Sequence, residues 1–341
     1  VKGDLDGIYY SYLVEDKYEV TDPYSKASSI NSIMSCVVDL SSTDPDGFRE
    51  SSLPENKENG AIIYELSVKD FTVDKSSGVK NKGKFLGLAE NDSKIGSFST
   101  GLSHLKELGV SHVQILPIYD FISVFEESER FFDDDNYNWG YDPELYFNVE
   151  GSYSTDPHNP KNRIYELKSM IDQIHKQGMS VIMDVVYNHT FKTYDSNFEI
   201  LAPGYYHRRN PDGSYSNGSG IGNEFSSEKP FGRKLIIDSL KYWVEEFKID
   251  GFRFDLMALI DLDTMELAIK ELKKINPNII IYGEPWMAFD SVLPESQQLK
   301  TQAQRSKGFG IFNDRFRNAI KGDNDGYEKG YIQGNFSLKK R

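Results

Sequence analysis

Apolar positions from residue 61 onward fall into two alternating patterns. Short, nearly continuous apolar runs predict buried strands, and they cover residues 61–66, 113–117, 181–186, 250–255, 279–284 and 310–314. Between these runs, apolar residues recur at helical spacing, which predicts amphipathic helices over residues 102–108, 167–174, 235–247 and 267–275. Strands that alternate with helices specify a parallel sheet.

Such a sheet can be open and bind a nucleotide, or it can close into a barrel. No GxGxxG motif follows the first predicted strand, and the chain has no phosphate-binding GK[ST] motif. A chain of 341 residues is long enough for a barrel with an appended module. We therefore predict an α/β fold with a (β/α)8 TIM-type barrel that is incomplete here, with about five to six strands before the last residue.

The chain before the barrel has a different pattern. Residues 8–20 alternate between apolar and polar positions around a polar turn, which predicts a β-hairpin. We expect residues 1–24 to be the end of a β-rich module, residues 25–60 to be a polar linker or wrapping segment, and residues 61–341 to form the barrel.

Composition narrows the class of partner. The net charge of -14 argues against nucleic acid and anionic membranes, because binding to these surfaces needs clustered Lys and Arg. No apolar run approaches the roughly 18 residues of a membrane span. The single cysteine, Cys36, excludes an intrachain disulfide within this sequence.

Polar side chains gather where three successive predicted strands end. The third strand runs into Asp184 and His189, the fourth carries Arg253 and Asp255, and Glu284 ends the fifth. Each residue alone has a structural explanation, such as an ion pair inside a barrel. Parallel barrels carry their functional groups at these strand ends, so acids that recur at three of them predict an active site.

Two carboxyl groups in one pocket are what glycosidic bond cleavage requires. Arg253 lies beside Asp255 and favours its charged form, which suits a nucleophile. Apolar Pro285 and Trp286 follow Glu284 and would keep it protonated, which suits a general acid. We expect the two carboxyl groups to lie roughly 5 to 5.5 Å apart, as in retaining glycosidases.

Four motifs carry a family resemblance. Residues 184–189, 251–255 and 283–286 resemble the first three conserved regions of the alpha-amylase superfamily, in the same order. Residues 137–143, Tyr-Asn-Trp-Gly-Tyr-Asp-Pro, resemble the signature heptapeptide of type I pullulanases. The resemblance implies a debranching enzyme that cleaves α-1,6 bonds in an α-glucan such as pullulan, branched starch or glycogen.

The resemblance also implies roles for individual residues. Asp255 matches the nucleophile, Glu284 the general acid/base and Arg253 the partner of the nucleophile. The expected substrate-binding residues, with Tyr141 stacking under the scissile sugar, are Asp184, His189, Arg253, Tyr141, Trp286, Asp142 and Asn188. Asn188 matches a calcium ligand of many amylases, but debranching enzymes often lack that site, so we expect no required cofactor and assign no metal.

Residues 1–24 are similar to the end of the β-sandwich that precedes the barrel in this family. The family uses a third acid, which follows a histidine on the seventh strand, and no histidine occurs after His207. We therefore expect a chain truncated at both ends, inactive and self-associating by itself. Two other readings stay open: an isoamylase-like or glycogen-debranching hydrolase, and a barrel that only binds glucan.

Overall fold

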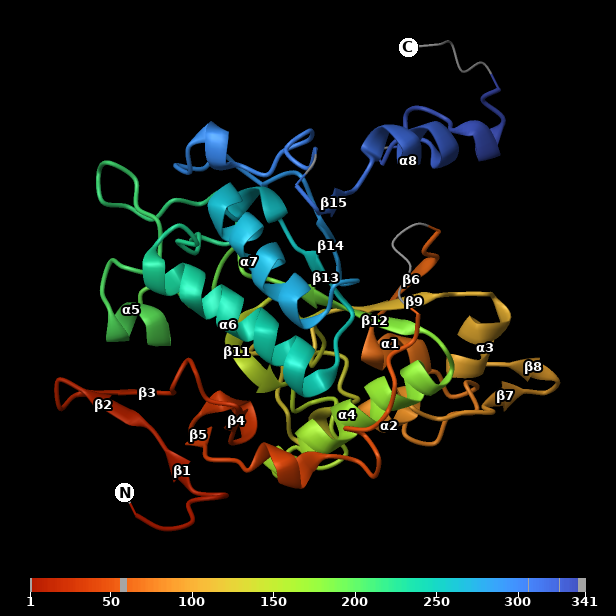
Figure 1. Ribbon diagram of the computed structural model, residues 1–341, viewed down its shortest axis with the longest axis horizontal. Helices are drawn as coiled ribbons and strands as arrows, with labels where there is room; N and C mark the ends of the chain where they lie inside the picture. Colours follow the sequence, from red (N-terminus) through yellow and green to blue (C-terminus); the bar gives the residue numbers. More distant parts are fainter. Residues whose placement is uncertain (1, 56–59, 306, 325, 337–341) are drawn as a thin grey trace.

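The computed structural model describes residues 2–55, 60–305, 307–324 and 326–336. Its centre is a parallel sheet whose six strands lie side by side in the order of the sequence (Figure 1). The strands are β6 (Ile63–Leu66), β9 (His112–Ile115), β12 (Ser180–Val185), β13 (Gly251–Phe254), β14 (Ile280–Gly283) and β15 (Gly310–Ile311). This arrangement confirms the prediction of a (β/α)8-type fold with part of its barrel sheet present.

The strand register determines which side chains of neighbouring strands lie at the same height along the sheet. Asp184 on β12 pairs with Arg253 on β13, and Arg253 pairs with Tyr282 on β14. Alternate residues of a strand share a face, so Asp255 and Glu284 lie on this same face, one level closer to the C-terminal edge. The register alone therefore directs the predicted catalytic residues to one edge of the sheet.

Helices connect the strands, as the apolar spacing predicts. The main ones are α3 (Gly101–Glu107), α4 (Pro160–Lys176), α6 (Pro230–Phe247) and α7 (Leu262–Ile275). Helix α4 begins with Asn159, whose side chain accepts hydrogen bonds from two backbone N–H groups, and Pro160 occupies the first turn. Helices α6 and α7 pack side by side (Figure 1). Within the described ranges, no helix is both long enough and apolar enough to cross a membrane.

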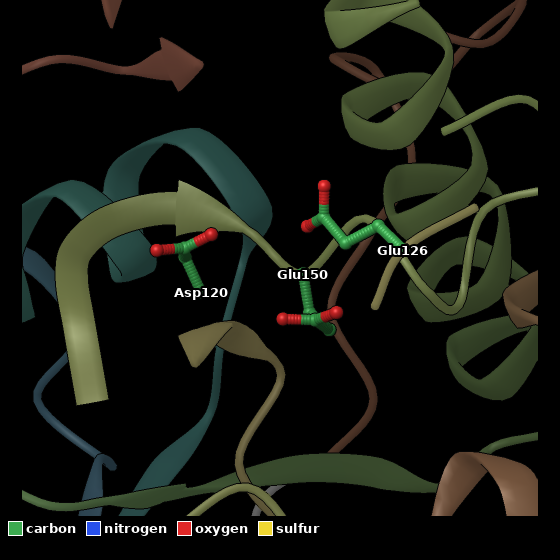
Figure 2. A group of neighbouring side chains, drawn as sticks. All are labelled: Asp120, Glu126 and Glu150. Carbon is green, nitrogen blue, oxygen red and sulfur yellow. The ribbon is translucent and has the colours of Figure 1, made fainter. Parts of the chain in front are cut away.

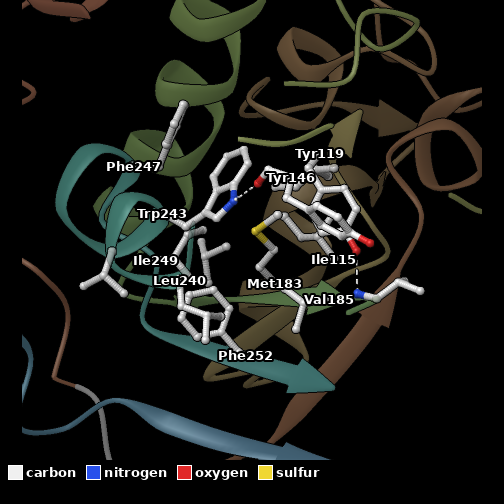
Figure 3. Packing of buried hydrophobic residues seen from close by; sticks show 14 of the residues in the cluster. Ile115, Tyr119, Tyr146, Met183, Val185, Leu240, Trp243, Phe247, Ile249 and Phe252 are labelled. Atoms are coloured by element: carbon white, nitrogen blue, oxygen red, sulfur yellow. Dashed lines mark hydrogen bonds between the residues drawn. The ribbon is translucent and has the colours of Figure 1, made fainter. Parts of the chain in front are cut away.

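The core lies between the sheet and these helices (Figure 3). Trp243 of α6 is fully buried there, and its Nε1 donates a hydrogen bond to the backbone oxygen of Tyr146 at 3.0 Å. Met183 and Phe252 reach the same core from β12 and β13, on the face opposite Asp184 and Arg253. Each of these two strands thus presents one apolar face to the helices, and its other face carries Asp184 or Arg253.

Several elements were not predicted. An antiparallel pair, β10 (Tyr119–Phe121) and β11 (Pro143–Val149), follows β9 and contains the end of the heptapeptide. All seven residues of β11 are buried, so its sequence lacks the alternation of a half-exposed strand. Shorter unpredicted elements are β7 (Lys94–Ile95), β8 (Phe98–Ser99), α1 (Val68–Thr72), α2 (Phe85–Leu88), α5 (Asn197–Leu201) and α8 (Asp314–Lys321).

The N-terminal residues contain the predicted hairpin, formed by β2 (Tyr12–Val14) and β3 (Tyr18–Val20). A small sheet of β1 (Tyr9–Tyr10), β5 (Ser35–Cys36) and β4 (Ala27–Ser28) accompanies it. The limits assigned to the module and the linker, residues 24 and 60, stay predictions.

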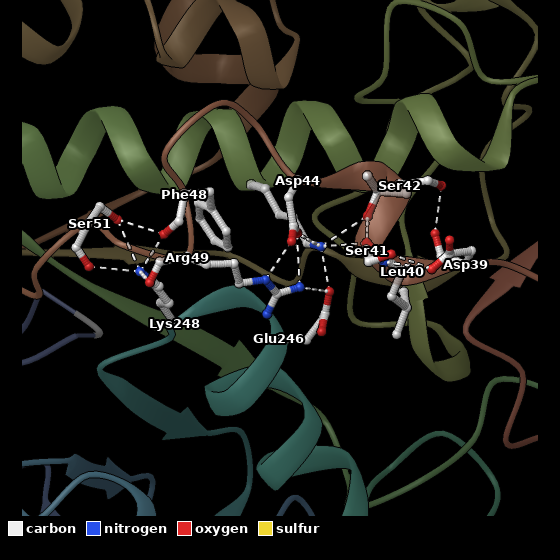
Figure 4. A network of polar contacts seen from close by, with 12 residues as sticks. Asp39, Leu40, Ser41, Ser42, Asp44, Phe48, Arg49, Ser51, Glu246 and Lys248 are labelled. Atoms are coloured by element: carbon white, nitrogen blue, oxygen red, sulfur yellow. Dashed lines mark hydrogen bonds and ion pairs between the residues drawn. The ribbon is translucent and has the colours of Figure 1, made fainter.

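Residues 39–51 lie against α4 and α6 (Figure 4). Arg49 forms ion pairs with Asp44 of its own segment at 2.5 Å and with Glu246 of α6 at 2.7 Å. Lys168 of α4 is completely buried and pairs with the same two carboxylates. Two cations and two anions therefore join this segment to both helices.

Candidate active site

The centre of the candidate site is the guanidinium group of Arg253. Its Nη1 donates to Oδ1 of Asp184 and to Oδ1 of Asp255, both at 3.0 Å, and its Nη2 donates to Oε1 of Glu284 at 2.6 Å. The Arg253 side chain is 7% exposed. One buried cation thus brings together three carboxyl groups that the sequence analysis placed on three separate strand ends.

Asp255 receives a second donor. Nδ2 of Asn188 donates to Oδ2 of Asp255 at 2.8 Å and to its backbone oxygen at 3.0 Å. With Arg253 on Oδ1, both carboxylate oxygens have a partner that orients them. The Asp255 side chain is 15% exposed, so it is oriented by the protein and still reachable from outside.

Glu284 is held from two sides as well. Arg253 binds Oε1, and the backbone N–H of Leu256 donates to Oε2 at 2.9 Å. Burial raises the pKa of Glu284, although the charge of Arg253 opposes that shift. A carboxyl group with a raised pKa keeps its proton to higher pH, which suits the predicted role of general acid.

Tyr141 and Asp184 form one wall of the site. The Tyr141 hydroxyl donates to Oδ2 of Asp184 at 2.8 Å, and the centre of its ring lies 5.9 Å from Cζ of Arg253. Asp184 is fully buried, and burial raises its pKa while the positive charge of Arg253 counteracts the effect. The ring of Tyr141 is therefore fixed next to the carboxyl groups.

His189 lies deeper than its predicted role in sugar binding suggests. It is 2% exposed, its Nδ1 lies 2.5 Å from Oδ1 of Asn188, and its Nε2 lies 3.1 Å from the backbone oxygen of Tyr141. Both ring nitrogens thus face protein oxygens. Burial lowers the pKa of His189. The structure places His189 next to the groups that orient Asp255 and Tyr141, and a contact with sugar stays a prediction.

The other two predicted binding residues lie at the rim. Oδ2 of Asp142 accepts hydrogen bonds from Ser123 and, at 2.8 Å, from Asn138, so it holds the heptapeptide loop. Trp286 is half-buried, and its ring centre lies 6.2 Å from that of Phe312. It lines an open cavity of about 650 Å³ with Pro285, Met287 and neighbouring residues.

A chain of polar side chains beneath the site was not predicted. The Tyr282 hydroxyl donates to Oε1 of Gln114 at 2.5 Å, and Nε2 of Gln114 donates to Oε2 of Glu65 at 2.6 Å. Because alternate residues of β14 share a face, Tyr282 lies on the same face as Glu284, and the sequence could have predicted its position at the site. The contact of Leu256 with Glu284 could not be predicted in this way, because Leu256 makes it through its backbone N–H.

Figure 2 shows a second cluster of acidic side chains, formed by residues other than those of the candidate site. Buried Asp120, Glu126 and Glu150 each place an oxygen within 4.8 Å of the others. Arg163 donates to both oxygens of Glu126, at 3.2 and 2.7 Å, and backbone N–H groups donate to both oxygens of Glu150. Since the cluster already contains its own cation and donors, we assign no metal to it.

Comparisons with known proteins agree with these motifs. Residues 91–219 match the family described as "Alpha amylase, catalytic domain". A pullulanase of Bacillus subtilis strain 168 is 40% identical over 329 residues, which cover 95% of this chain and 45% of that protein. Pullulanase 1 of Arabidopsis thaliana chloroplasts is 32% identical over 375 residues, covering 93% of this chain and 38% of that protein.

Solved structures give the same result. A pullulanase of Paenibacillus barengoltzii, in complex with maltohexaose and alpha-cyclodextrin, has a TM-score of 0.91 and 45% identity over 97% of this chain and 52% of its own. A pullulanase of Bacillus acidopullulyticus has a TM-score of 0.93 and 42% identity over 98% of this chain and 41% of its own. The chain spans between 38% and 52% of the length of these four relatives.

Proposed function

This chain is a homologue of the pullulanases and contains part of an alpha-amylase catalytic domain, and on that premise we propose that the protein is a retaining glycoside hydrolase that cleaves α-1,6-glucosidic branch bonds. The observation that supports this most directly is the single guanidinium of Arg253, which binds both Asp255 and Glu284. It places two carboxyl groups with different surroundings on one side of the sheet.

In the first step, a carboxylate oxygen of Asp255 attacks the anomeric carbon while Glu284 gives its proton to the departing glycosidic oxygen. The C–O bond to the leaving glucan breaks as the bond to Asp255 forms. In the second step, Glu284 takes a proton from water, and the resulting nucleophile releases the sugar from Asp255. Two inversions give net retention of configuration.

Arg253 supports both steps without giving up a proton. Its fixed positive charge lies between the two carboxyl groups and orients them before substrate arrives. The raised pKa of Glu284 keeps the acid protonated in the first step. Neither the nucleophile nor the general acid needs a metal or an organic cofactor for its role, so we propose that the reaction requires no cofactor.

We further propose an α-glucan as substrate, with branched starch, glycogen and pullulan as its natural forms. The heptapeptide of residues 137–143 and the pullulanase relatives support the α-1,6 linkage. Tyr141, fixed by Asp184 beside Arg253, offers a ring face for the scissile sugar. Trp286 follows Glu284 by two residues and lines an open cavity with Pro285 and Met287, which suits the leaving chain.

Pullulan hydrolysis by the whole protein tests the proposal. Pullulan is a chain of maltotriose units joined by α-1,6 bonds, so maltotriose is the expected sole product. A trisaccharide that still contains an α-1,6 bond at complete digestion would show that α-1,4 bonds are cut and would overturn the assignment. Failure to release any sugar while glucan still binds would favour the glucan-binding alternative. The matched controls are Asp255→Asn and Glu284→Gln, which keep the size of each side chain.

A further inference from the structure

The connection between β12 and α6, residues 186–229, is held to the active site by an internal polar network. Its backbone pairs in short stretches: the N–H of Phe225 donates to the oxygen of Asn188 at 2.9 Å, and the N–H of Ser226 donates to the oxygen of Tyr206 at 2.7 Å. His207 and Phe225 form an antiparallel bridge. Residues 206 and 207 therefore pair with residues 226 and 225, and Phe225 in turn binds the backbone of Asn188, whose side chain orients Asp255.

His207 lies at the centre of this network and touches two other segments. Its side chain is fully buried. Nδ1 lies 3.1 Å from Oε2 of Glu199 on α5, and Nε2 lies 2.8 Å from the hydroxyl oxygen of Thr190. Oε1 of Glu199 is in turn held by the backbone N–H of Gly204 at 2.8 Å. One imidazole thus joins α5 to the residue that directly follows His189.

Thr190 is held at every polar group. Its hydroxyl donates to the backbone oxygen of Lys192 at 2.6 Å, in addition to its contact with His207. The amide of Asn223 accepts from the Thr190 N–H at 3.1 Å and donates to the Thr190 backbone oxygen at 2.8 Å. These bonds leave the peptide after Asn188 and His189 little freedom to rotate.

Asn188 connects the Thr190 segment to the nucleophile Asp255. Two residues before Thr190, its side-chain amide holds the carboxylate of Asp255 at 2.8 Å. Arg208, the residue after His207, holds the segment that follows Asp255. Its Nη1 donates to the backbone oxygen of Leu259 at 2.9 Å. Residues 207 and 208 therefore support the segments on both sides of the Asn188–Asp255 contact.

We propose that His207 is a positioning residue for the hydrolysis: through Thr190 it holds Asn188, and so Asp255, in the orientation for attack. The inference rests on the proposed function. His207 is buried and contacts protein groups at both nitrogens, so it reaches no substrate. A displacement of the nucleophile by about 1 Å can cost on the order of 100-fold in rate.

Two substitutions separate the two contacts of His207. In His207→Gln, the amide extends to the position of Nε2 and keeps the bond to Thr190. In His207→Asn, the shorter amide reaches only the position of Nδ1 and keeps the bond to Glu199. With pullulan as substrate and the substitutions made in the whole protein, we expect the Asn variant to lose at least about tenfold in kcat with KM nearly unchanged, and the Gln variant to retain most of the rate.

Two substitutions at Thr190 test the same contact independently of the His207 variants. Thr190→Val removes the hydroxyl without changing the shape and should lower kcat as His207→Asn does, whereas Thr190→Ser restores the hydroxyl and the rate. Because the two residues act through one contact, the double variant His207→Asn with Thr190→Val should be no slower than the slower single variant. His158→Asn, at an exposed histidine near the start of α4, is the matched control.

Thermal unfolding and circular dichroism on the same samples separate positioning from folding. If His207→Asn fails to fold, the rates of Thr190→Val and Thr190→Ser test whether the contact between His207 and Thr190 positions Asp255. Equal rates for the Asn and Gln variants, or a lower melting temperature with unchanged kcat, would overturn the inference. A wild-type protein that does not cleave pullulan would instead contradict the proposed function, so the two failures can be told apart.

Discussion

The backbone N–H of Leu256 donates to Oε2 of Glu284 at 2.9 Å, and Leu256 adopts a left-handed conformation, with φ 38° and ψ 50°, to make this contact. A branched side chain rarely adopts this conformation, which costs roughly 1–2 kcal/mol. Strain of this kind persists where the surrounding structure holds it, and it concentrates at functional sites. With Arg253 on the other oxygen, Glu284 is oriented before substrate arrives.

Substitutions at Leu256 test this relationship. Leu256→Asn should keep the left-handed conformation, because Asn tolerates it. Leu256→Val adds branching at Cβ and should lower the free energy of unfolding by about 1–2 kcal/mol, and it should reduce kcat by displacing the N–H from Glu284. Urea unfolding and pullulan kinetics on both variants check the result. A Val variant as stable and as active as the Asn variant would contradict it.

Asp255→Asn in the whole protein should abolish turnover and leave glucan binding nearly intact. The covalent step fails without the carboxylate, whereas Tyr141 and Arg253 remain in place. Initial rates on pullulan and calorimetric titration with maltotriose measure the two effects. Retention of more than about a hundredth of the wild-type kcat would rule out Asp255 as the nucleophile.

The alkaline limb of kcat/KM should follow Glu284. The acid must be protonated, so the rate falls as pH rises through its pKa, which burial raises. The negative charge of Glu65 also raises this pKa, so Glu65→Gln should move the alkaline limb to lower pH while the acidic limb stays in place. pH–rate profiles measure the shift. Glu50→Gln, at an exposed glutamate, is the control, and a shift of the same size there would exclude a specific effect of Glu65.

Stability should fall as pH rises above 5, because of the acidic cluster in Figure 2. Burial and the neighbouring charge of Glu126 raise the pKa of Glu150 from 4.5 to about 7, and burial raises that of Asp120 as well. The folded protein therefore binds protons more tightly than the unfolded chain. The stability that the raised pKa of Glu150 provides is complete below about pH 4.5 and is lost as pH rises through about 7, a change of about 3 kcal/mol.

Asp120→Asn should flatten this dependence. Oδ1 of Asp120 accepts from Ser32 at 2.5 Å, and Oδ2 has no hydrogen-bond partner among the described residues. An amide has nearly the same size as the carboxyl group, keeps an oxygen to accept from Ser32, and removes one of the competing charges. Denaturant unfolding between about pH 5 and pH 8 measures the slope. Asp134→Asn, on an exposed loop, should leave the slope as in the wild type. An unchanged slope in Asp120→Asn would show that the cluster does not carry the effect.

Local patterns were sufficient for the barrel strands and for the chemistry of their ends. A buried parallel strand needs a continuous apolar run, and the apolar runs marked the six strands to within a few residues, although the edge strands β6 and β15 are only partly buried. Because parallel strands end at one edge of the sheet, the acids at the ends of β12, β13 and β14 had to converge, whatever the conformation of the loops. The sequence alone therefore predicts the charged residues at the centre of the site: Asp184, Arg253, Asp255 and Glu284.

The contacts that orient these residues depended on the path of the chain. Nothing periodic connects Glu199, Thr190 and His207, which meet because α5 and the following turns fold back on the end of β12. Likewise, the left-handed turn at Leu256 comes from the backbone and leaves no mark in its side chain. Side-chain periodicity reports which face is buried, whereas such contacts between irregular segments are set by tertiary packing, because each of them depends on loops whose conformation only the rest of the fold determines.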